Sequence, residues 1–463
     1  MASLWNTIKE NLPEVTSPTQ KNLSFKEKLK WTSLVLSFYF VLGIIPLFGL
    51  GQNALTQFEY LSLILGAKFG TIISLGIGPI VTASIILQLL NGSGLIKFDL
   101  SSKAGKQNYG AIQKLSQYGF VLFEAIIYVF MGGFAPSPLY QGTALYFQLE
   151  LLLIFQLLLG GLMIILMDEV CQKWGFGSGV SLFIAAGVSQ QLFHRAFSWT
   201  ASPTNPNISV GALPALFQSL AAGDPTTALL MGAGILSTIA IFAIVVYVQS
   251  MKVEIPLSFG RIRGHGIRWP LSFIYTSNIP VILIAAFMST MQLWGRLLEN
   301  WGYPILGTFS GNVPITGMVS WFNSPNLVQK LITRSLTFSD LSHSFVYILI
   351  MMFGSVVFSY FWVQTANMDA GSQAENIMKS GLQVPGFRKD KRVLEKLLDR
   401  YISPLTVMGA MIVGFLAAAA DLSGALVSGT GLLLTVMIIY KLYESIAKTH
   451  MYDMHPALRK FME

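Results

Sequence analysis

The sequence predicts an all-α polytopic membrane protein whose ten membrane-spanning helices form two inverted five-helix halves. Three observations support this class. The 463-residue chain is 53% hydrophobic and only 11% charged, whereas soluble domains carry about 25% charged residues. Apolar runs near the length that a bilayer requires, about 20 residues, recur along the chain. Each half also contains a span interrupted by proline together with glycine or polar residues, a pattern typical of helices that line a cavity.

The apolar runs fix the order of the elements. They are residues 31–48, 70–90, 117–133, 146–167, 177–193, 227–248, 271–294, 344–363, 402–420 and 424–443. Because the number of runs is even, both termini lie on the same side of the membrane. Most lysines and arginines fall before the first run, after the even-numbered runs or after the last, and the other face receives only Lys68, Arg195, Arg296, Lys330 and Arg334. This bias predicts that both termini are cytoplasmic.

The runs define the predicted domain organisation, which begins with a cytoplasmic segment, 1–30, and the N-terminal half, 31–193, with helices one to five. An external loop, 194–226, leads to the C-terminal half, 227–443, with helices six to ten. That half carries the cytoplasmic loops 252–270 and 366–401, and a cytoplasmic tail, 444–463, ends the chain. Because five spans are an odd number, the second half enters the membrane from the opposite side, as in an inverted repeat.

A short half-helix precedes the second run. Thr56-Gln57-Phe58-Glu59 matches a capping box, and Gly66 ends the helix about ten residues later. Such a helix is too short to cross a bilayer. The run that follows is broken by Gly76-Ile77-Gly78-Pro79, and the matching run of the other half is broken by Thr276-Ser277-Asn278-Ile279-Pro280. Matching breaks in inverted halves predict a pathway between the halves.

Two cytoplasmic loops are longer and more basic than simple connections require. One carries Arg261, Arg263 and Arg268, and the other carries Arg388, Lys389, Lys391 and Arg392 after a Pro-Gly turn. Either loop alone is equally consistent with an ordinary inside-positive loop, but two on one face favour docking to an anionic partner such as RNA or an acidic protein. Residues 393–401 have helical apolar spacing, which predicts an extramembrane amphipathic helix.

The long external loop, 295–343, carries large aromatic side chains. We expect Trp301, Phe309, Trp321 and Phe322 to pack at the membrane interface.

Composition argues against metal, cofactor and hydrolytic chemistry. Cys171 is the only cysteine, and the five histidines lack ligand spacing, so no cofactor and no metal site are expected. Gly177-Ser178-Gly179 lacks the pattern of a nucleophile elbow and a nearby histidine base, which argues against an intramembrane hydrolase.

Intramembrane acids bear on the second alternative, a secondary transporter of small solutes. They are few, namely Glu124, Glu150 and Asp421, whereas an ion-coupled transporter usually has a chain of such groups. Residues near helix ends, or paired with a neighbouring polar group, are better explained as structural. Two aliphatic pairs, Ile77 with Val81 and Val180 with Ile184, share helix faces, although spacing alone favours plain core packing.

Motifs of a recognisable kind cover nearly the whole chain in order. They are Gly70-Thr71 through Ser74–Thr82, Met167-Asp168-Glu169, Gly177–Gly179, Leu182–Gly187, Ile255-Pro256-Leu257, Tyr275–Pro280, Gly386-Phe387-Arg388-Lys389, Pro404–Met408 and Gly429–Leu433. Together these motifs resemble the SecY family, the channel subunits of the Sec protein translocon, in its archaeal and eukaryotic branch. The 295–343 loop matches only loosely.

The resemblance implies a protein-conducting channel, not an enzyme, that passes unfolded secretory polypeptides and releases transmembrane segments sideways into lipid. It implies an aliphatic ring at the waist of the channel: Ile77, Val81, Val180, Ile184, Ile282 and Leu434. It also implies a plug closing the outer side of the ring: Thr56, Gln57, Phe58, Glu59, Tyr60, Leu61, Ser62, Leu63, Ile64 and Leu65. A lateral gate is expected between runs two and three on one side and seven and eight on the other.

The implied partners are the ribosome, signal sequences and nascent polypeptides, membrane lipid, a SecE-type gamma subunit and a small beta-type subunit. The basic residues Arg261, Arg263, Arg268, Arg388, Lys389, Lys391 and Arg392 are expected to dock the ribosome. The protein would be a multi-pass integral membrane protein, in the cell membrane of an archaeon or in the endoplasmic reticulum of a eukaryote.

Overall fold

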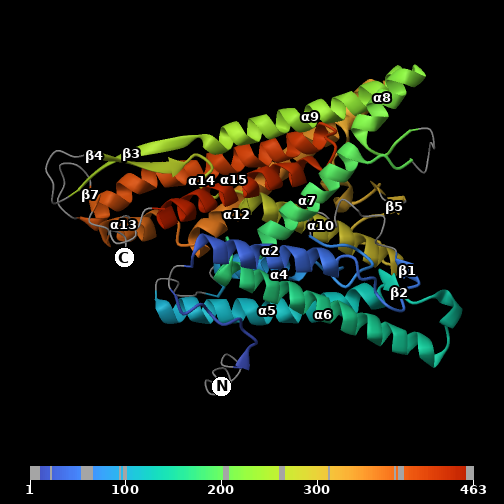
Figure 1. Cartoon of the computed structure of the whole chain (residues 1–463), viewed down its shortest axis with the longest axis horizontal. Coiled ribbons are helices and arrows are strands. Elements are labelled where there is room, and N and C mark those ends of the chain that lie inside the picture. Colours follow the sequence, from blue (N-terminus) through green and yellow to red (C-terminus); the bar gives the residue numbers. More distant parts are fainter. Residues whose placement is uncertain are drawn as a thin grey trace.

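A computed structural model shows a bundle of long helices lying side by side (Figure 1). It describes residues 11–20, 23–53, 66–92, 95–96, 102–201, 208–259, 266–310, 313–379, 382–383 and 390–454. The predicted apolar runs of the N-terminal half overlap helices α2 (Phe25–Leu42), α4 (Gly78–Gly92), α5 (Lys103–Phe130), α6 (Ala144–Trp174) and α7 (Gly179–Phe197). Those of the C-terminal half overlap helices α9 (Pro225–Ser250), α10 (Ile279–Asn300), α12 (Phe338–Thr365), α14 (Lys391–Leu422) and α15 (Gly429–Met454).

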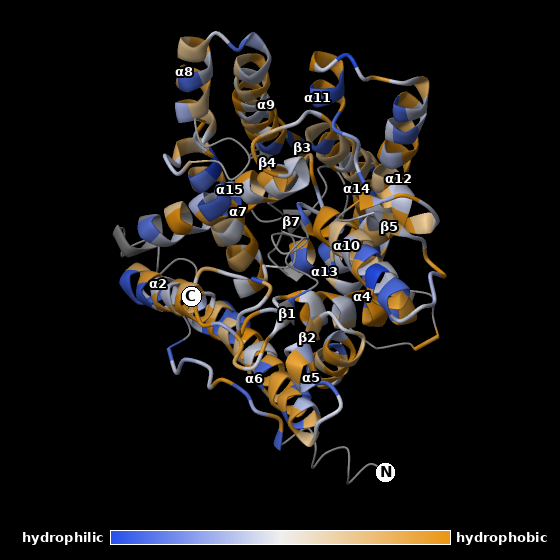
Figure 2. Ribbon diagram, turned by 90° about the vertical axis from the view of Figure 1, so that its right-hand side faces the viewer, coloured by the Kyte–Doolittle hydropathy of each residue, from blue (hydrophilic) through white to orange (hydrophobic). Residues whose placement is uncertain are grey.

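The bundle is that of an integral membrane protein. In the described part of the chain, six helices are long and apolar enough to cross a membrane: α6, α9, α10, α12 with its extension, α14 and α15. Hydrophobic residues cover the outward faces of the bundle, for example along α6 and α9 (Figure 2). On α9, Leu236 is 69% exposed and Ile239 60% exposed. Exposed apolar surface of this extent is expected where a helix faces lipid.

Short elements gather at the two ends of the bundle (Figure 1). One end carries the hairpin of β3 (Lys252–Phe259) and β4 (Gly266–Ser272), with α13 (Ala370–Lys379) and β7 (Leu382–Gln383). The other end carries strands β1 (Gln52–Asn53) with β2 (Phe134–Ala135) and β5 (Phe309–Ser310) with β6 (Val313–Pro314). It also carries helices η1 (Pro138–Tyr140), α8 (Ala212–Ala222), η2 (Met318–Phe322) and α11 (Leu327–Ile332).

The predicted amphipathic helix at 393–401 exists, but it is not a separate element. Its residues form the first turns of α14, which continues through Pro404 into the ninth apolar run. Leu394 and Leu398 are buried in a small second core beside α13 and the β3–β4 hairpin. This packing holds the first turns of α14 in line with the apolar part of the helix.

The segment before α4, residues 71–77, is a series of turns rather than a helix. Its amide hydrogen bonds span three residues, as from Gly76 to the Ile73 carbonyl at 3.0 Å. Helix α6 shields it, and a Cβ at Gly160 would lie 1.9 Å from the Ile72 carbonyl oxygen, so only glycine permits this approach. The irregular backbone is therefore packed against protein, as membrane depth requires.

Candidate functional site

The six residues expected to form the waist occupy one hydrophobic cluster. Ile77 and Val81 flank the start of α4, Val180 and Ile184 lie in the first two turns of α7, Ile282 lies on α10 and Leu434 lies on α15. Five of the six are buried within the main core cluster, and the half-buried Val180 packs against it. These side chains, separated by up to 357 positions between Ile77 and Leu434, therefore belong to the same core, which also contains many other residues of the bundle. No polar atom belongs to any of these six side chains.

The break that precedes α10 mirrors the break that precedes α4. Pro79 is the second residue of α4, and Pro280 is the second residue of α10. The polar residues Thr276, Ser277 and Asn278 are buried, and the Ser359 hydroxyl donates to the Thr276 hydroxyl at 3.0 Å. The Ser277 hydroxyl donates to the Asn278 side-chain oxygen at 2.9 Å. Because these buried polar groups have partners on α12 or within the break, the second irregular segment is also enclosed in protein.

The predicted plug, 56–65, lies outside the described residues, but the point where the chain leaves it is described. The Tyr39 hydroxyl on α2 donates to the Gly66 carbonyl at 3.0 Å, and the Tyr39 ring stacks on Phe183 with centroids 4.8 Å apart. A Cβ at Gly66 would lie 3.6 Å from the Cγ2 atom of Ile77. The residue that follows the predicted plug is therefore anchored beside the aliphatic cluster.

The predicted gate separates α4 and α5 from α10 and α12, and the two pairs touch. Helix α4 packs against both α10 and α12. Phe123 on α5 stacks against Trp294 on α10, with ring centroids 5.7 Å apart and planes inclined by 30°. The Phe123 side chain is 45% exposed, so this aromatic contact lies at the lipid-facing edge of the seam.

Two of the three intramembrane acids predicted to be structural accept hydrogen bonds from neighbouring helices. Glu124 is buried on α5 and accepts a hydrogen bond from the Thr82 hydroxyl of α4 at 3.3 Å. Asp421 accepts the Tyr347 hydroxyl of α12 at 2.8 Å. Glu150 is half-buried near the start of α6. Glu124 and Asp421 therefore tie helices together, which their positions in the sequence did not reveal.

The structure joins the two basic loops in one sheet. β3 pairs with β4 and also with β7, through Ser258 with Gln383 and Phe259 with Leu382. The segments 260–265 and 384–389, with Arg261, Arg263, Arg388 and Lys389, lie outside the described residues. The strands that precede them, β3 and β7, are neighbours at the same end of the bundle (Figure 1).

The described basic residues of these loops are accessible. Arg268 on β4 is 79% exposed and pairs with Glu254 at 2.9 Å. Lys391, which pairs with Glu375 at 3.5 Å, and Arg392 are exposed at the start of α14. Exposed ion pairs of this kind contribute little to stability, so these cations remain able to bind an anionic surface.

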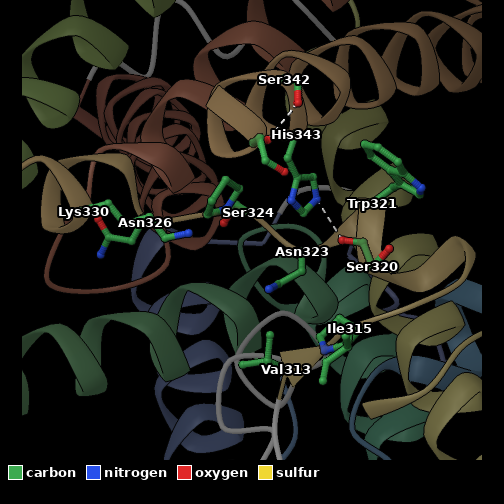
Figure 3. A pocket seen from close by; sticks show the side chains of 13 residues that line it. Val313, Ile315, Ser320, Trp321, Asn323, Ser324, Asn326, Lys330, Ser342 and His343 are labelled. Carbon is green, nitrogen blue, oxygen red and sulfur yellow. Dashed lines mark hydrogen bonds between the residues drawn. The ribbon is translucent and has the colours of Figure 1, made fainter. Parts of the chain in front are cut away.

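The 295–343 loop and the start of α12 form a pocket of about 480 Å³ between β6, η2, α11 and α12 (Figure 3). The Trp321 and His343 rings meet edge to face with centroids 5.3 Å apart, and the His343 Nε2 atom lies 2.9 Å from the Ser320 carbonyl oxygen. Trp301 and Trp321 are exposed, whereas Phe309 and Phe322 pack against the core. The packing at the membrane interface that we expect for this loop stays a prediction. Among the described residues, no cluster of acidic, histidine or cysteine side chains could hold a metal ion.

Known proteins of one family are similar to this chain in sequence and in structure. A family model described as SecY matches residues 71–443. The protein translocase subunit SecY of Methanococcus vannielii is 42% identical over 455 residues, which cover 98% of each chain. One similar solved structure has a TM-score of 0.82 and 41% identity, and the match covers 97% of this chain and 98% of that one. It is described as a SecY protein whose plug domain stabilises the closed state of the translocation channel. Sec61 in the canine ribosome-channel complex from the endoplasmic reticulum has a TM-score of 0.79 and 39% identity, with the same coverage.

Proposed function

Because the chain belongs to the SecY family, we propose that it forms a protein-conducting channel for unfolded secretory polypeptides. The observation that carries this proposal is the main core cluster, to which each half contributes the first turn of a broken helix, α4 and α10. The relatives are named as channel subunits, and no catalytic family is indicated. The channel itself makes and breaks no bond, so a partner supplies the driving energy.

We assign the waist to Ile77, Val81, Val180, Ile184, Ile282 and Leu434. An aliphatic ring offers no ligands to a hydrated ion, and a narrow apolar neck tends to lose its water. Because dispersion contacts are individually weak and non-directional, the ring can deform around any passing side chain. One constriction thereby excludes ions and still admits polypeptides.

The plug role of residues 56–65 is supported by the anchoring of Gly66. The Tyr39 hydrogen bond fixes the end of that segment next to Ile77, so a half-helix immediately before Gly66 can reach the waist. In this proposal the plug closes the outer side of the ring in the resting channel, and it moves away when a polypeptide enters.

The lateral exit lies between the α4–α5 pair and the α10–α12 pair. The Phe123–Trp294 contact at the lipid edge of this seam is aromatic, so it can separate without leaving a buried charge unpaired. A segment of about 20 apolar residues is stabilised by leaving through this seam into lipid, whereas polar segments continue through the waist. The substrate's own hydropathy thereby selects its route.

The topology in this proposal has ten membrane-spanning helices with both termini in the cytoplasm. The β3–β4–β7 sheet then presents both basic loops to a cytoplasmic partner, which we propose to be the ribosome, as in the related ribosome-channel complex. A SecE-type gamma subunit and a small beta-type subunit complete the assembly. The archaeal origin of its relatives supports a place in an archaeal cell membrane.

Reconstitution tests the function against the transporter alternative. Proteoliposomes containing the chain and its two small partners would be programmed with ribosomes translating a secretory precursor. We expect the precursor to become protected from external protease, while a labelled amino acid or sugar is not accumulated. Accumulation of a small solute without protection of the precursor would overturn the proposal.

A further inference from the structure

The carboxylate of Asp168 holds the beginning of α7. Asp168 lies near the end of α6, and its Oδ1 atom accepts the Val180 amide at 3.0 Å, while the Gly179 amide also donates to the carboxylate. Its Oδ2 atom accepts from the Gln172 side-chain amide at 2.8 Å. A carboxylate at a helix N-terminus satisfies free amides and interacts favourably with the helix dipole. The residue held directly, Val180, belongs to the proposed waist.

The carboxylate of Asp421 holds the beginning of α15 in the same way. Asp421 lies near the end of α14, and its Oδ1 atom accepts the Thr430 amide at 2.8 Å, while the Gly429 amide also donates to the carboxylate. Its Oδ2 atom accepts from the hydroxyls of Thr430 and Tyr347. The Tyr347 bond links this cap to α12.

The two caps are equivalent in the two halves. Each helix begins with a glycine that presses on the preceding helix end: a Cβ at Gly179 would lie 2.7 Å from the Cα atom of Asp168, and a Cβ at Gly429 would lie 2.3 Å from the Asp421 nitrogen. Five residues after its glycine, each helix carries a proposed waist residue, Ile184 in α7 and Leu434 in α15. In both halves, an aspartate cap and a helix-initial glycine thus come shortly before the proposed waist residue.

The two capped helices are neighbours that run in opposite directions. Helices α7 and α15 pack against each other, and α7 ends beside α8 while α15 runs towards the C-terminal end of the chain (Figure 1). A Cβ at Gly431 would lie 3.2 Å from a methyl carbon of Val188. Because the helices are antiparallel, moving three residues forward from Gly431 to Leu434 corresponds to moving back along α7 from Val188 towards Ile184. Leu434 and Ile184 therefore lie at about the same height along the helix axes, between the two caps.

We propose that Asp168 and Asp421 are positioning residues that fix the height of α7 and α15, and therefore the registration of Ile184 with Leu434 in the closed waist. The inference rests on the proposed function, since it needs those two residues to be part of the seal. Without a cap, the first turn of each helix loses its partners and frays. The aliphatic residue in the next turn then loses its fixed position, and the closed waist becomes permeable to ions.

The test is the resting current of the purified complex with its small partners in a planar bilayer, in potassium chloride and without substrate. Asp168→Ala and Asp421→Ala should each raise the current severalfold. Asp168→Asn and Asp421→Asn should raise it less, because asparagine still caps through its side-chain oxygen but lacks the charge. The matched control is Asp224→Ala. Asp224 caps α9 through the Thr226 and Thr227 amides, and α9 carries no proposed waist residue, so that variant should stay tight.

Gentler variants cover the case in which the alanine variants fail to assemble. Tyr347→Phe removes one hydrogen bond to Asp421, and Gln172→Leu removes one to Asp168; each should raise the resting current slightly. Ile184→Asn serves as the reference for the proposed function. If Ile184→Asn leaks and the four aspartate variants match Asp224→Ala, the capping inference is wrong while the waist stands. If Ile184→Asn does not leak, the waist itself is misplaced.

Discussion

Val81 and Ile282 occupy the same place in the two halves of the molecule. Each lies two residues after the proline at the second position of a broken helix, and each donates its amide to a carbonyl four residues earlier, from Val81 to Ile77 and from Ile282 to Asn278, both at 3.0 Å. Both side chains are buried in the main core cluster. The first hydrogen-bonded turn after each break therefore buries one branched aliphatic side chain in the main core.

In the proposed channel, this equivalence explains how the two irregular segments, before α4 and before α10, place aliphatic residues at one constriction. A helix that resumes after a break has a defined first turn, because proline fixes the backbone there and needs no amide partner. When two such helices come from inverted halves, their first turns meet at mid-height from opposite directions. In the proposed channel, the position of the waist is thus set by where these helices start and does not depend on their lengths.

The first prediction concerns topology. Cysteines placed by Arg388→Cys and Asn205→Cys should react differently with a membrane-impermeant maleimide added from outside, with labelling at 205 and none at 388. Cys171 is fully buried, so the parent protein should give little background and need not be altered. Labelling of position 388 in sealed cells would contradict the ten-helix arrangement.

The second prediction concerns docking. Changing Arg388, Lys389, Lys391 and Arg392 to glutamate should weaken ribosome binding, because the charges that meet the anionic surface are reversed. If they contact RNA phosphates, the dependence of affinity on salt concentration should also become shallower. Sedimentation of ribosomes with proteoliposomes over a salt series measures both.

The matching control replaces the same four residues with glutamine, which should give an intermediate affinity. Neither change should alter assembly, since Lys391 makes only an exposed ion pair with Glu375. Unchanged ribosome affinity at every salt concentration would mean that the loop is only an inside-positive anchor.

The third prediction concerns the lateral gate. Trp294→Ala removes the stacked contact with Phe123, and aromatic pairs contribute about 0.5–1.5 kcal/mol beyond their burial. We expect the closed gate to lose about 1 kcal/mol, which is roughly a fivefold change in population. Translocation of precursors whose signal sequences have shortened apolar cores should therefore become more efficient.

Trp301→Ala is the control for this measurement. The Trp301 ring is 64% exposed, and its ring contact is with Tyr303 in the same loop, so that variant should keep the wild-type threshold. Equal thresholds for the Trp294 and Trp301 variants would show that the aromatic contact does not hold the gate closed.

The sequence predicts the order of the helices well because hydrophobic runs and their breaks are local patterns. Glycine and proline at 76–79 and the polar residues at 276–278 mark irregular backbone by residue type alone. The waist residues are different, since the spacing of Ile77 and Val81 also fits ordinary core packing. Their assignment came from the resemblance to a family, and the structure adds that they share one cluster.

Other features depend on contacts that no local pattern contains. The Asp421 carboxylate meets Tyr347, which lies 74 positions away, so its role as a cap is invisible along the chain. Strand β7 has only two residues and exists because β3 is beside it. The amphipathic helix predicted at 393–401 forms the first turns of α14. The helix continues from there into the ninth apolar run, because it accommodates Pro404.

The last prediction concerns the waist. Ile184→Asn and Ile282→Asn should raise the resting ion current of a planar bilayer, because a polar side chain in the neck can hold water there. Val81→Ile should change little, since the seal remains apolar and branched. Deleting residues 56–65 should add only part of the leak, because the ring remains as a second barrier. Weak signal sequences should also be accepted more readily in the asparagine variants, as the closed state becomes less stable.

A matched control separates a leaking waist from a damaged core. Ile164 on α6 is as fully buried as Ile184 and belongs to the same cluster, but it is not a proposed waist residue. Ile164→Asn should lower thermal stability, as a buried unpaired amide costs about 1–3 kcal/mol, without opening an ion path in the molecules that remain folded. If Ile184→Asn combined with Ile282→Asn leaves the channel as tight as the parent, or if Ile164→Asn leaks equally, these residues are core packing and the constriction lies elsewhere.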